Sequence, residues 1–520
     1  MGMFAIQEGE EPAERLVDER VSGLAREFLR MSDVSSDIEI KSLFDKFRTS
    51  DIPSDPGDAG NYIDYLADNV VAHSIRVSSP RFIGHMTSGL PYFIRPLGKL
   101  LTAMNQNTVK METAKALTPY ERQALAMIHR LIFNFPDEFY NRNIQRKEST
   151  LGMLVSGGTL ANITALWCMR NHHLGPRDGF AGVEAEGLPA ALEEYGYKGA
   201  VVIGSSLMHY SFQKAVDLLG IGSRSLIKVS ADRNNRLELP ALRQAVEECR
   251  ARKQHIIALV GIAGVTDSGA IDPLPEMADI ASEYDIPFHV DAAWGGPVLF
   301  SERHRNKLAG IERADSVTID GHKQMYLPMG IGIVMLRNPQ IAKSIEKQAR
   351  YIVRAASSDL GKRALEGSRP ATALYLHAAL HIIGSRGYEF LIDEGIRKTQ
   401  FMADTLRMRP EFELIAEPQI NILIYRYIPE AFRERAARGI LNENEKGIIN
   451  QFNERLQKAQ RQAGRSFVSR TTLETTAHGR GVPVVVLRAV LANPLTTEQD
   501  ILCVLNEQVK IASHLEGQTL

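Results

Sequence analysis

Lys323 lies between two apolar runs in the stretch VTIDGHKQMYLPMGIG at 317–332, a position where globular proteins rarely have a lysine. Lysine is seldom buried without a partner, so Lys323 either lies on a surface loop or has its charge used inside the protein. A partly buried lysine is the nucleophile with which many enzymes bind carbonyl groups covalently. The surface loop is the commoner fate of a lysine, so neighbouring motifs must decide between the two interpretations.

An aspartate ends another apolar run, in the stretch HVDAAWGG at 289–296. A carboxylate at a buried strand end needs a cationic partner or strong hydrogen bonds, and a protonated heterocyclic nitrogen is such a cation. The alternative is that Asp291 only begins a tight turn. The interval from Asp291 to Lys323 leaves room for one helix and one strand, so both residues can meet at one edge of a sheet.

Two further motifs occur where predicted strands lead into helices. SGGTLAN at 156–162 combines two glycines with Thr159 and the free N–H groups of a new helix, a set that suits a phosphate. MHYS at 208–211 offers His209, whose imidazole can stack on an aromatic ring. Each motif alone is more often structural. Together with the lysine and the aspartate, they describe a site for pyridoxal 5'-phosphate (PLP).

Seven short apolar runs between 150 and 340 supply the strands that must position these residues. They begin near 151, 200, 225, 256, 286, 315 and 330, and helical segments separate most of them. Continuous apolar runs are typical of strands covered by helices on both faces, which predicts an α/β layer with a mainly parallel sheet. The link from 319 to 331 has little room for a crossover helix, so we expect the last strand to be antiparallel.

The flanking sequence predicts two further units. Thr118 and Glu121 form a capping-box pattern with Pro119 at the first helical position, which predicts a helix with one buried face. Strands are expected near 412–416, 420–427, 467–473 and 482–490. We therefore expect an N-terminal helical segment at 1–117 that contributes to a dimer and to the substrate pocket, a large PLP-binding domain at 118–375, and a small C-terminal α+β domain at 376–520.

Bulk composition narrows the function. Sixty-one basic and 62 acidic residues leave a net charge of −1, which argues against nucleic-acid binding by bulk electrostatics. The chain has no apolar run of about 18 residues and no signal peptide, so we expect no membrane association. Cys168, Cys249 and Cys503 show no CxxC spacing, which predicts free thiols in a reducing cytoplasm and no metal site.

In this order, SGGT, HYS, VDAAWGG and GHK resemble the motifs of the group II PLP-dependent amino-acid decarboxylases. The stretches SSPRFIGHMTSGLP (78–91), HKQMYLPMGIG and LEGSRP (365–370) are most similar to a bacterial branch, the pyridoxal-dependent aspartate 1-decarboxylases. The resemblance is strong over about residues 60–400. It implies the aspartate-aminotransferase fold (PLP fold type I) and a homodimer with its active site at the subunit boundary.

The resemblance implies roles for residues that would contact the cofactor. Lys323 would bind PLP covalently, and Asp291 would pair with its ring nitrogen. His209 would stack on one face of the ring as a catalytic residue, and Ala293 would pack on the other face. The remaining expected cofactor contacts are Gly158, Thr159, Thr266 and His322.

Four residues are expected to act on the substrate. The resemblance implies that Arg369 in GSRP binds the α-carboxylate, for which the bidentate geometry of arginine is suited. It also implies that Tyr351 returns a proton to the substrate as general acid on a mobile loop, although a packed aromatic side chain is the alternative. His85 and Thr87 are candidates for binding a distal carboxylate.

The function implied is decarboxylation of a small acidic L-amino acid, with L-aspartate to β-alanine and CO2, a supply for pantothenate, as the first expectation. Glutamate to GABA and decarboxylation of cysteine sulfinate are the near alternatives, while a PLP-dependent C–C lyase and a non-catalytic protein of this fold are more remote. One departure concerns Asp320, because many family members have Asn-Pro before His-Lys where this chain has Asp320-Gly321. An acidic residue disfavours a phosphate, so we leave Asp320 out of the phosphate site.

Overall fold

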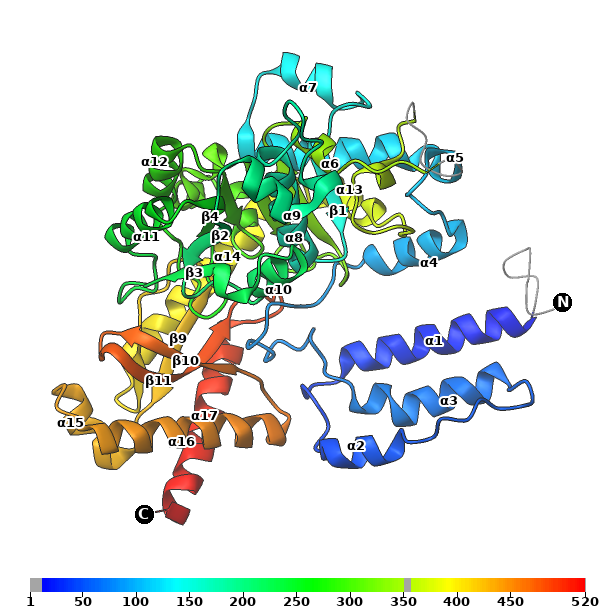
Figure 1. The fold of residues 1–520 in the computed structure, drawn as a ribbon. Coiled ribbons are helices and arrows are strands. Elements are labelled where there is room, and N and C mark those ends of the chain that lie inside the picture. Colours follow the sequence, from blue (N-terminus) through cyan, green and yellow to red (C-terminus); the bar gives the residue numbers. More distant parts are fainter. Residues whose placement is uncertain (1–11, 350–356, 520) are drawn as a thin grey trace.

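The structure, a computed structural model, describes residues 12–349 and 357–519. Its largest sheet lies in the large domain, in which Figure 1 labels β1 to β4. The strand order of this sheet is β1-β7-β6-β5-β4-β2-β3. The strands are β1 (Gly152–Val155), β2 (Gly199–Ser205), β3 (Leu226–Val229), β4 (Gln254–Ile262), β5 (Phe288–Asp291), β6 (Ser316–Asp320) and β7 (Gly332–Leu336). Five of them, β6 to β3 in this order, are parallel neighbours, whereas β7 runs antiparallel to both β6 and β1. The predicted mainly parallel sheet and its antiparallel last strand are therefore confirmed.

Alternate residues of these strands enter two hydrophobic clusters, one on each face of the sheet. In β1, Leu154 joins one cluster, while Met153 and Val155 join the other. Helices α6 (Leu117–Phe133), α11 (Leu239–Ala251) and α12 (Leu274–Tyr284) complete the first cluster. Helices α8 (Gly158–His173) and α10 (Ser211–Leu218) complete the second. This burial on both faces explains why the strands are continuous apolar runs in the sequence.

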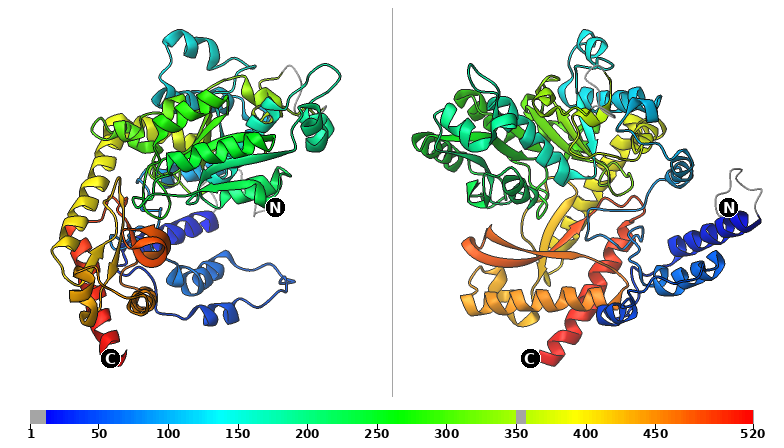
Figure 2. Two further views of the ribbon diagram at one scale, coloured as in Figure 1. Left: turned by 60° about the vertical axis from the view of Figure 1, so that its left-hand side comes forward. Right: turned by 45° about the vertical axis from the view of Figure 1, so that its right-hand side comes forward.

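A second, smaller sheet is built from the C-terminal part of the chain (Figure 2). Its antiparallel strands follow the order β10-β11-β9-β8, with β8 (Phe412–Leu414), β9 (Ile422–Tyr427), β10 (Ser469–Thr476) and β11 (Gly479–Val490). Helices α16 (Glu443–Ala463) and α17 (Glu498–Thr519) pack on it. The long helix α14 (Gly384–Arg407) contributes Tyr388 to the core of the large sheet and Met402 to that of the small one, so it joins the two layers.

The N-terminal part is helical, as expected. Helices α1 (Pro12–Arg30), α2 (Ile40–Lys46) and α3 (Ala59–Asn69) form a group that extends away from the rest of the molecule (Figures 1 and 2). The chain then returns along the small sheet, where Ile83 accepts a hydrogen bond from the N–H of Val490 at 2.6 Å. It continues into α4 (Ile94–Met104). The exact limits of the three predicted units remain a prediction.

The predicted start of α6 was wrong. The helix begins at Leu117, and the described side chains give its N-terminus no side-chain cap. The carboxylate of Glu121 pairs with Arg369 instead, and Thr118 Oγ1 has no hydrogen-bond partner among the described residues. The capping box was lost because a buried cation from a distant segment outcompetes a local backbone N–H for the carboxylate.

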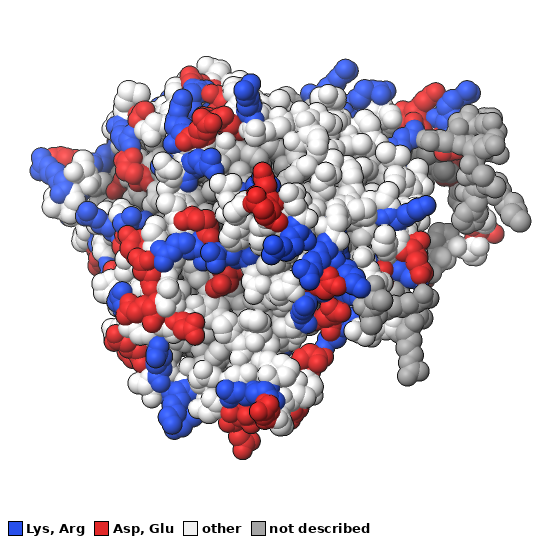
Figure 3. All heavy atoms as spheres, turned by 90° about the horizontal axis from the view of Figure 1, so that it is seen from above, with Lys and Arg blue, Asp and Glu red and all other residues white. Residues whose placement is uncertain are grey.

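The remaining α-helices of residues 12–349 and 357–519 are short or peripheral. They are α5 (Met111–Ala114), α7 (Asp137–Asn143), α9 (Val183–Glu194), α13 (Ala373–Ile382) and α15 (Arg433–Ala437). Across the described chain, every helix is too short or too polar to cross a bilayer. On the face seen in Figure 3, acidic and basic side chains lie interspersed, in keeping with the near-zero net charge.

Candidate active site

A cavity of about 320 Å³ lies where the parallel strands of the large sheet end. Its wall takes residues from the β1–α8 turn, the β2–α10 junction, the ends of β4 and β5, and the β6–β7 turn, together with one residue from the N-terminal part. The expected site residues on this wall are His85, Gly158, Thr159, His209, Thr266, Asp291, Ala293, His322 and Lys323. Residues spread over 239 positions of the sequence thus meet at one edge of a sheet, as open α/β folds require.

Lys323 sits in the tight turn between β6 and β7. Its N–H donates to Asp320 O at 3.2 Å, and the N–H of Gly321 donates to Ile331 O at 2.9 Å, which closes the turn. The side chain is 17% exposed, and Nζ lies 3.6 Å from Asp320 Oδ2. The lysine is therefore partly buried beside a carboxylate and faces the cavity rather than open solvent.

Asp291 is the last residue of β5 and is buried. Its Oδ1 accepts a hydrogen bond from the N–H of Ala293 at 3.1 Å, and its Oδ2 accepts one from Asn162 Nδ2 at 3.0 Å. Both oxygens therefore have a protein donor, yet the carboxylate still lines the cavity. A group with one cationic nitrogen would complete the environment of this buried charge.

His209 lies at the junction of β2 and α10. Its Nδ1 accepts a hydrogen bond from the N–H of Ser211 at 3.3 Å, which leaves the proton of the neutral ring on Nε2. Burial lowers the pKa of His209, and the nearby Lys323 ammonium lowers it further, although Asp291 acts in the opposite direction. A neutral, oriented imidazole on the cavity wall is suited to stacking on a planar ring.

The glycine turn after β1 is shaped by close backbone packing. Gly157 has φ +139°, and a Cβ on Gly332 would lie 2.3 Å from Gly157 C. Gly158 opens α8, so the first N–H groups of a 16-residue helix point to the cavity beside Thr159. This cradle, the lysine, the aspartate and the neutral histidine fit the phosphate, the aldehyde and the ring of PLP.

Asp320 belongs to the cavity wall, although the sequence argument left it out of the phosphate site. Its Oδ1 lies 3.0 Å from His322 Nδ1, and a Cβ on Gly158 would lie 2.8 Å from its Oδ2. The carboxylate thus lies beside the side chains of both His322 and Lys323 and faces the cavity with them.

Two of the expected substrate residues, Arg369 and Thr87, are not among the residues that line this cavity. Arg369 forms a buried bidentate pair with Glu121, with Nη1 2.9 Å from Oε2. Thr87 has a buried Oγ1 with no hydrogen-bond partner among the described residues. Tyr351 lies outside the residues that the structure describes. The roles of all three remain predictions.

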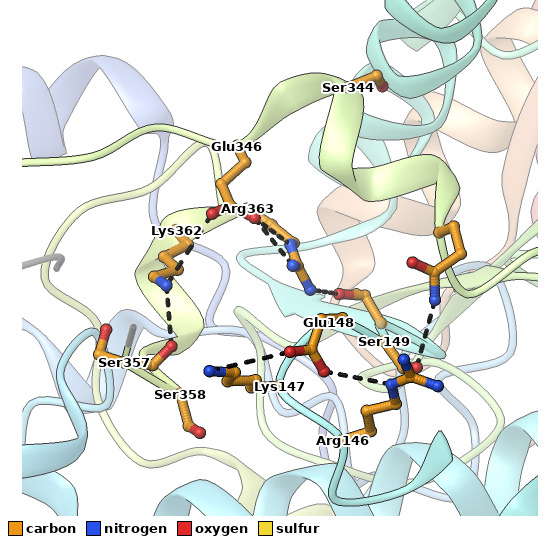
Figure 4. A network of polar contacts seen from close by, with 12 residues as sticks. Arg146, Lys147, Glu148, Ser149, Ser344, Glu346, Ser357, Ser358, Lys362 and Arg363 are labelled. Carbon is orange, nitrogen blue, oxygen red and sulfur yellow. Dashed lines mark hydrogen bonds and ion pairs between the residues drawn. The ribbon is translucent and has the colours of Figure 1, made fainter. Parts of the chain in front are cut away.

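The two flanks of the segment that contains Tyr351 are held together by a polar network (Figure 4). The N–H of Lys347 donates to Lys362 O at 2.8 Å, and Glu346 pairs with Arg363 at 2.8 Å. Arg363 also donates to Thr150 Oγ1 at 2.7 Å, next to the start of β1. The base of this segment is therefore fixed to the large domain on the β1 side.

Sequence reasoning missed an arginine that comes from the small sheet. Arg488 in β11 is 8% exposed, donates from Nη1 to Thr266 O at 2.8 Å and from Nη2 to Gly84 O at 3.3 Å. Its buried Nε has no partner among the described residues, and burial lowers its pKa. The signal was a single charge inside the apolar run VVVLRAVL at 484–491.

Comparison with known proteins agrees with this geometry. Residues 48–428 match the model of the pyridoxal-dependent decarboxylase conserved domain. The chain is 43% identical over 518 residues to aspartate 1-decarboxylase of Aliivibrio fischeri, covering 99% of this chain and 94% of that protein. It is 29% identical over 361 residues to L-2,4-diaminobutyrate decarboxylase of Rhizobium meliloti, covering 68% and 66% respectively.

Solved structures share the fold. Mouse CSAD superposes with a TM-score of 0.84 at 23% identity, covering 96% of this chain and 99% of that one. Oryza sativa TDC, solved with PLP and tryptamine, superposes with a TM-score of 0.82 at 18% identity, covering 98% and 100%. With the family model matching most of its length, this chain belongs to the pyridoxal-dependent decarboxylase family and is a PLP-dependent enzyme.

Proposed function

We propose that this enzyme removes the α-carboxylate of L-aspartate and produces β-alanine and CO2. The observation that carries the choice of substrate is the 43% identity, over 99% of the chain, to an aspartate 1-decarboxylase. The cavity supports it chemically, because His85 and Lys323 line it, and the Arg488 guanidinium lies behind Thr266, another lining residue, to whose main-chain oxygen it donates. A substrate with two carboxylates needs such a surrounding.

The residues of the cavity divide the work between cofactor and substrate. PLP, when bound, supplies a ring that accepts the electron pair released as the C–COO⁻ bond breaks. Lys323 would hold the cofactor, Asp291 would pair with the ring nitrogen and favour its protonated form, and His209 would orient the ring by stacking. Tyr351 is proposed to deliver the proton that replaces CO2 on the substrate carbon.

Two arginines compete for the substrate carboxylate in this proposal. Arg369 would have to exchange the carboxylate of Glu121 for that of the substrate, since its pair with Glu121 is bidentate and buried. Arg488 has no carboxylate to exchange among the described residues, because its guanidinium donates to main-chain oxygens, and its neighbour Thr266 lines the cavity. Arg488 is therefore the better placed of the two for a carboxylate inside the cavity.

His85 and Thr87 remain the candidates for the second carboxylate. Burial lowers the pKa of His85, and the charges of Arg488, Lys323 and His322 lower this pKa further. The ring is therefore neutral at pH 7 when no substrate is bound. An incoming carboxylate would offset those cations and favour a proton on the ring. The segment is firmly placed, because a Cβ on Gly84 would lie 2.4 Å from Ser469 N.

We further propose that the enzyme is a cytoplasmic homodimer that supplies β-alanine for pantothenate. The three cysteines are free thiols, which favours a reducing compartment. The N-terminal helices expose large apolar side chains, among them Phe44 (71%) and Tyr62 (60%), which favours a protein partner. A second copy of the chain is the partner that the family resemblance implies.

The first experiment offers the purified enzyme with PLP four substrates: L-aspartate, L-glutamate, cysteine sulfinate and L-tyrosine. We expect CO2 and β-alanine from L-aspartate at a kcat/KM at least about tenfold above that for the other three. GABA as the main product would keep the decarboxylase and overturn the substrate. Cofactor binding without CO2 from any of these acids would favour cleavage of another bond.

A further inference from the structure

A line of buried polar side chains leads from Asp291 into the interior of the large domain. Asn162 Nδ2 donates to Asp291 Oδ2 at 3.0 Å, and Asn162 Oδ1 lies 3.0 Å from His289 Nε2. His289 Nδ1 in turn lies 2.7 Å from Ser316 Oγ. All these side chains are at least nine-tenths buried, with Asn162 1% and His289 and Ser316 0% exposed. Three elements contribute to the line, namely α8, β5 and β6.

The carboxylate at one end sets the direction of every hydrogen bond in this line. A carboxylate only accepts, so the amide of Asn162 must turn its Nδ2 toward Asp291 and its Oδ1 toward His289. His289 must then carry its proton on Nε2, and its free Nδ1 must accept the hydroxyl proton of Ser316. Burial lowers the pKa of His289 to about 4, so the ring is neutral and has one proton to give. The three hydrogen bonds of the line thus have one consistent set of donors and acceptors.

The line also fixes how the carboxylate of Asp291 is turned. Its Oδ1 is held by the N–H of Ala293, and its Oδ2 is held by Asn162. With one oxygen tied to the main chain and the other to a side chain that is itself held by His289, rotation of the carboxylate is restricted. Asn162 Nδ2 also contacts Ser211 Oγ at 3.0 Å, which ties the amide to the start of α10, the helix after His209.

We propose that Asn162 and His289 are positioning residues, which hold the Asp291 carboxylate in the orientation that the ring nitrogen of PLP requires. A cofactor nitrogen and a carboxylate interact strongly only when the oxygen lies in line with the N–H bond, so a freely turning carboxylate binds the ring less well. The inference rests on the cofactor and holds for any of the amino-acid substrates considered above.

The helix offers a matched control for a purely structural role. Asn171 lies on the same helix α8, is 3% exposed, and donates from Nδ2 to Ser344 O at 3.0 Å. Replacing either asparagine by leucine removes one buried amide of the same helix at similar volume. Only Asn162 is connected to Asp291, so the two variants separate loss of stability from loss of orientation.

The test compares Asn162→Leu, Asn171→Leu and Ser316→Ala as apoenzymes titrated with PLP. We expect the PLP dissociation constant of Asn162→Leu to rise about tenfold or more, because a hydrogen bond to a charged group is lost. Its kcat at saturating PLP should fall while the substrate KM stays within about twofold. The PLP-induced rise in melting temperature should shrink for Asn162→Leu and stay as in wild type for Asn171→Leu.

Ser316→Ala decides the matter if Asn162→Leu does not fold. Ser316 lies at the far end of the line from Asp291, so its hydroxyl reaches the carboxylate through His289 and Asn162. Without it His289 can move its proton to Nδ1, and we expect the PLP dissociation constant to rise about threefold. An unchanged dissociation constant and kcat in Asn162→Leu, or in Ser316→Ala where that variant alone is measured, would overturn the proposal. The assay is independent of the substrate, so failure here leaves the proposed reaction untouched.

Discussion

At the scale of single residues, the least expected feature is a buried arginine that has no carboxylate partner among the described residues. Arg369 is paired with Glu121, and Arg426 is paired with Glu413. Within the described part of the chain, the Arg488 guanidinium instead donates to two main-chain oxygens, Thr266 O and Gly84 O. Leaving a buried charged donor unpaired costs free energy, and an incoming carboxylate would recover it. This supports the proposal that Arg488 binds a carboxylate of the substrate.

This assignment predicts the behaviour of Arg488→Gln. We expect its KM for L-aspartate to rise at least about tenfold, because a charge-assisted hydrogen bond to the substrate is lost, while its PLP dissociation constant stays near that of wild type. Arg470→Gln, which removes an exposed arginine on the neighbouring strand β10, serves as the control. A larger effect on KM from Arg369→Gln than from Arg488→Gln would return the carboxylate role to Arg369.

At the scale of elements, a buried histidine joins two helices to strand β7 of the large sheet. His129 in α6 lies 3.2 Å from Leu336 O at the end of β7 and 3.1 Å from the hydroxyl of Tyr140 in α7. Burial lowers the pKa of His129 from 6.5 to about 4. The lowered pKa in the folded state means that the neutral ring stabilises the fold above pH 6.5, and that this contribution is lost as the pH falls toward 4.

Acid sensitivity should therefore depend on His129. The full contribution of the neutral His129 ring to the free energy of unfolding is about 3 kcal/mol. About 2 kcal/mol of this contribution should be lost between pH 7 and pH 5. We expect His129→Gln to have a lower melting temperature than wild type at pH 7. Its melting temperature should fall less than that of wild type when the pH is lowered from 7 to 5. His381→Gln, at an exposed position of α13, should show the same fall in melting temperature between pH 7 and pH 5 as wild type. An equal loss in wild type and His129→Gln would contradict this account.

The elements also show how much of the fold and of the candidate site could be predicted from the sequence. The strand ends that carry Asp291 and Lys323 were predictable, because unbroken apolar runs mark buried strands and chain order places their ends at one edge. The ion pair between Glu121 and Arg369 was not predictable, because nothing in the local sequence of α6 indicates that Arg369 lies beside Glu121. Arg488 was missed for the same reason: it belongs to the second sheet, and only the folded structure brings it beside Gly84 and beside Thr266, which lines the cavity.

At the scale of the whole molecule, the N-terminal helices carry the large exposed apolar side chains that the proposed dimer would cover. Helices α1 to α3 extend away from the two sheets (Figure 2), and Phe44, Ile52 and Tyr62 are 71%, 92% and 60% exposed. Side chains of this size on one segment cost free energy in water and are normally covered by another protein surface. A homodimer would cover these side chains and would place the arm of each copy, helices α1 to α3, against the other copy.

Dimerisation can be tested through this arm. We expect the wild-type enzyme to sediment as a dimer at micromolar concentration, and Phe44→Asp combined with Tyr62→Asp to shift it toward the monomer, because two buried apolar contacts would become charged. Activity should fall with dilution in the variant if the subunit boundary completes the site. Phe390→Asp changes a side chain in α14 that is 65% exposed and should leave the dimer intact. A monomeric wild type, or an arm variant as dimeric as wild type on dilution, would place the partner surface elsewhere.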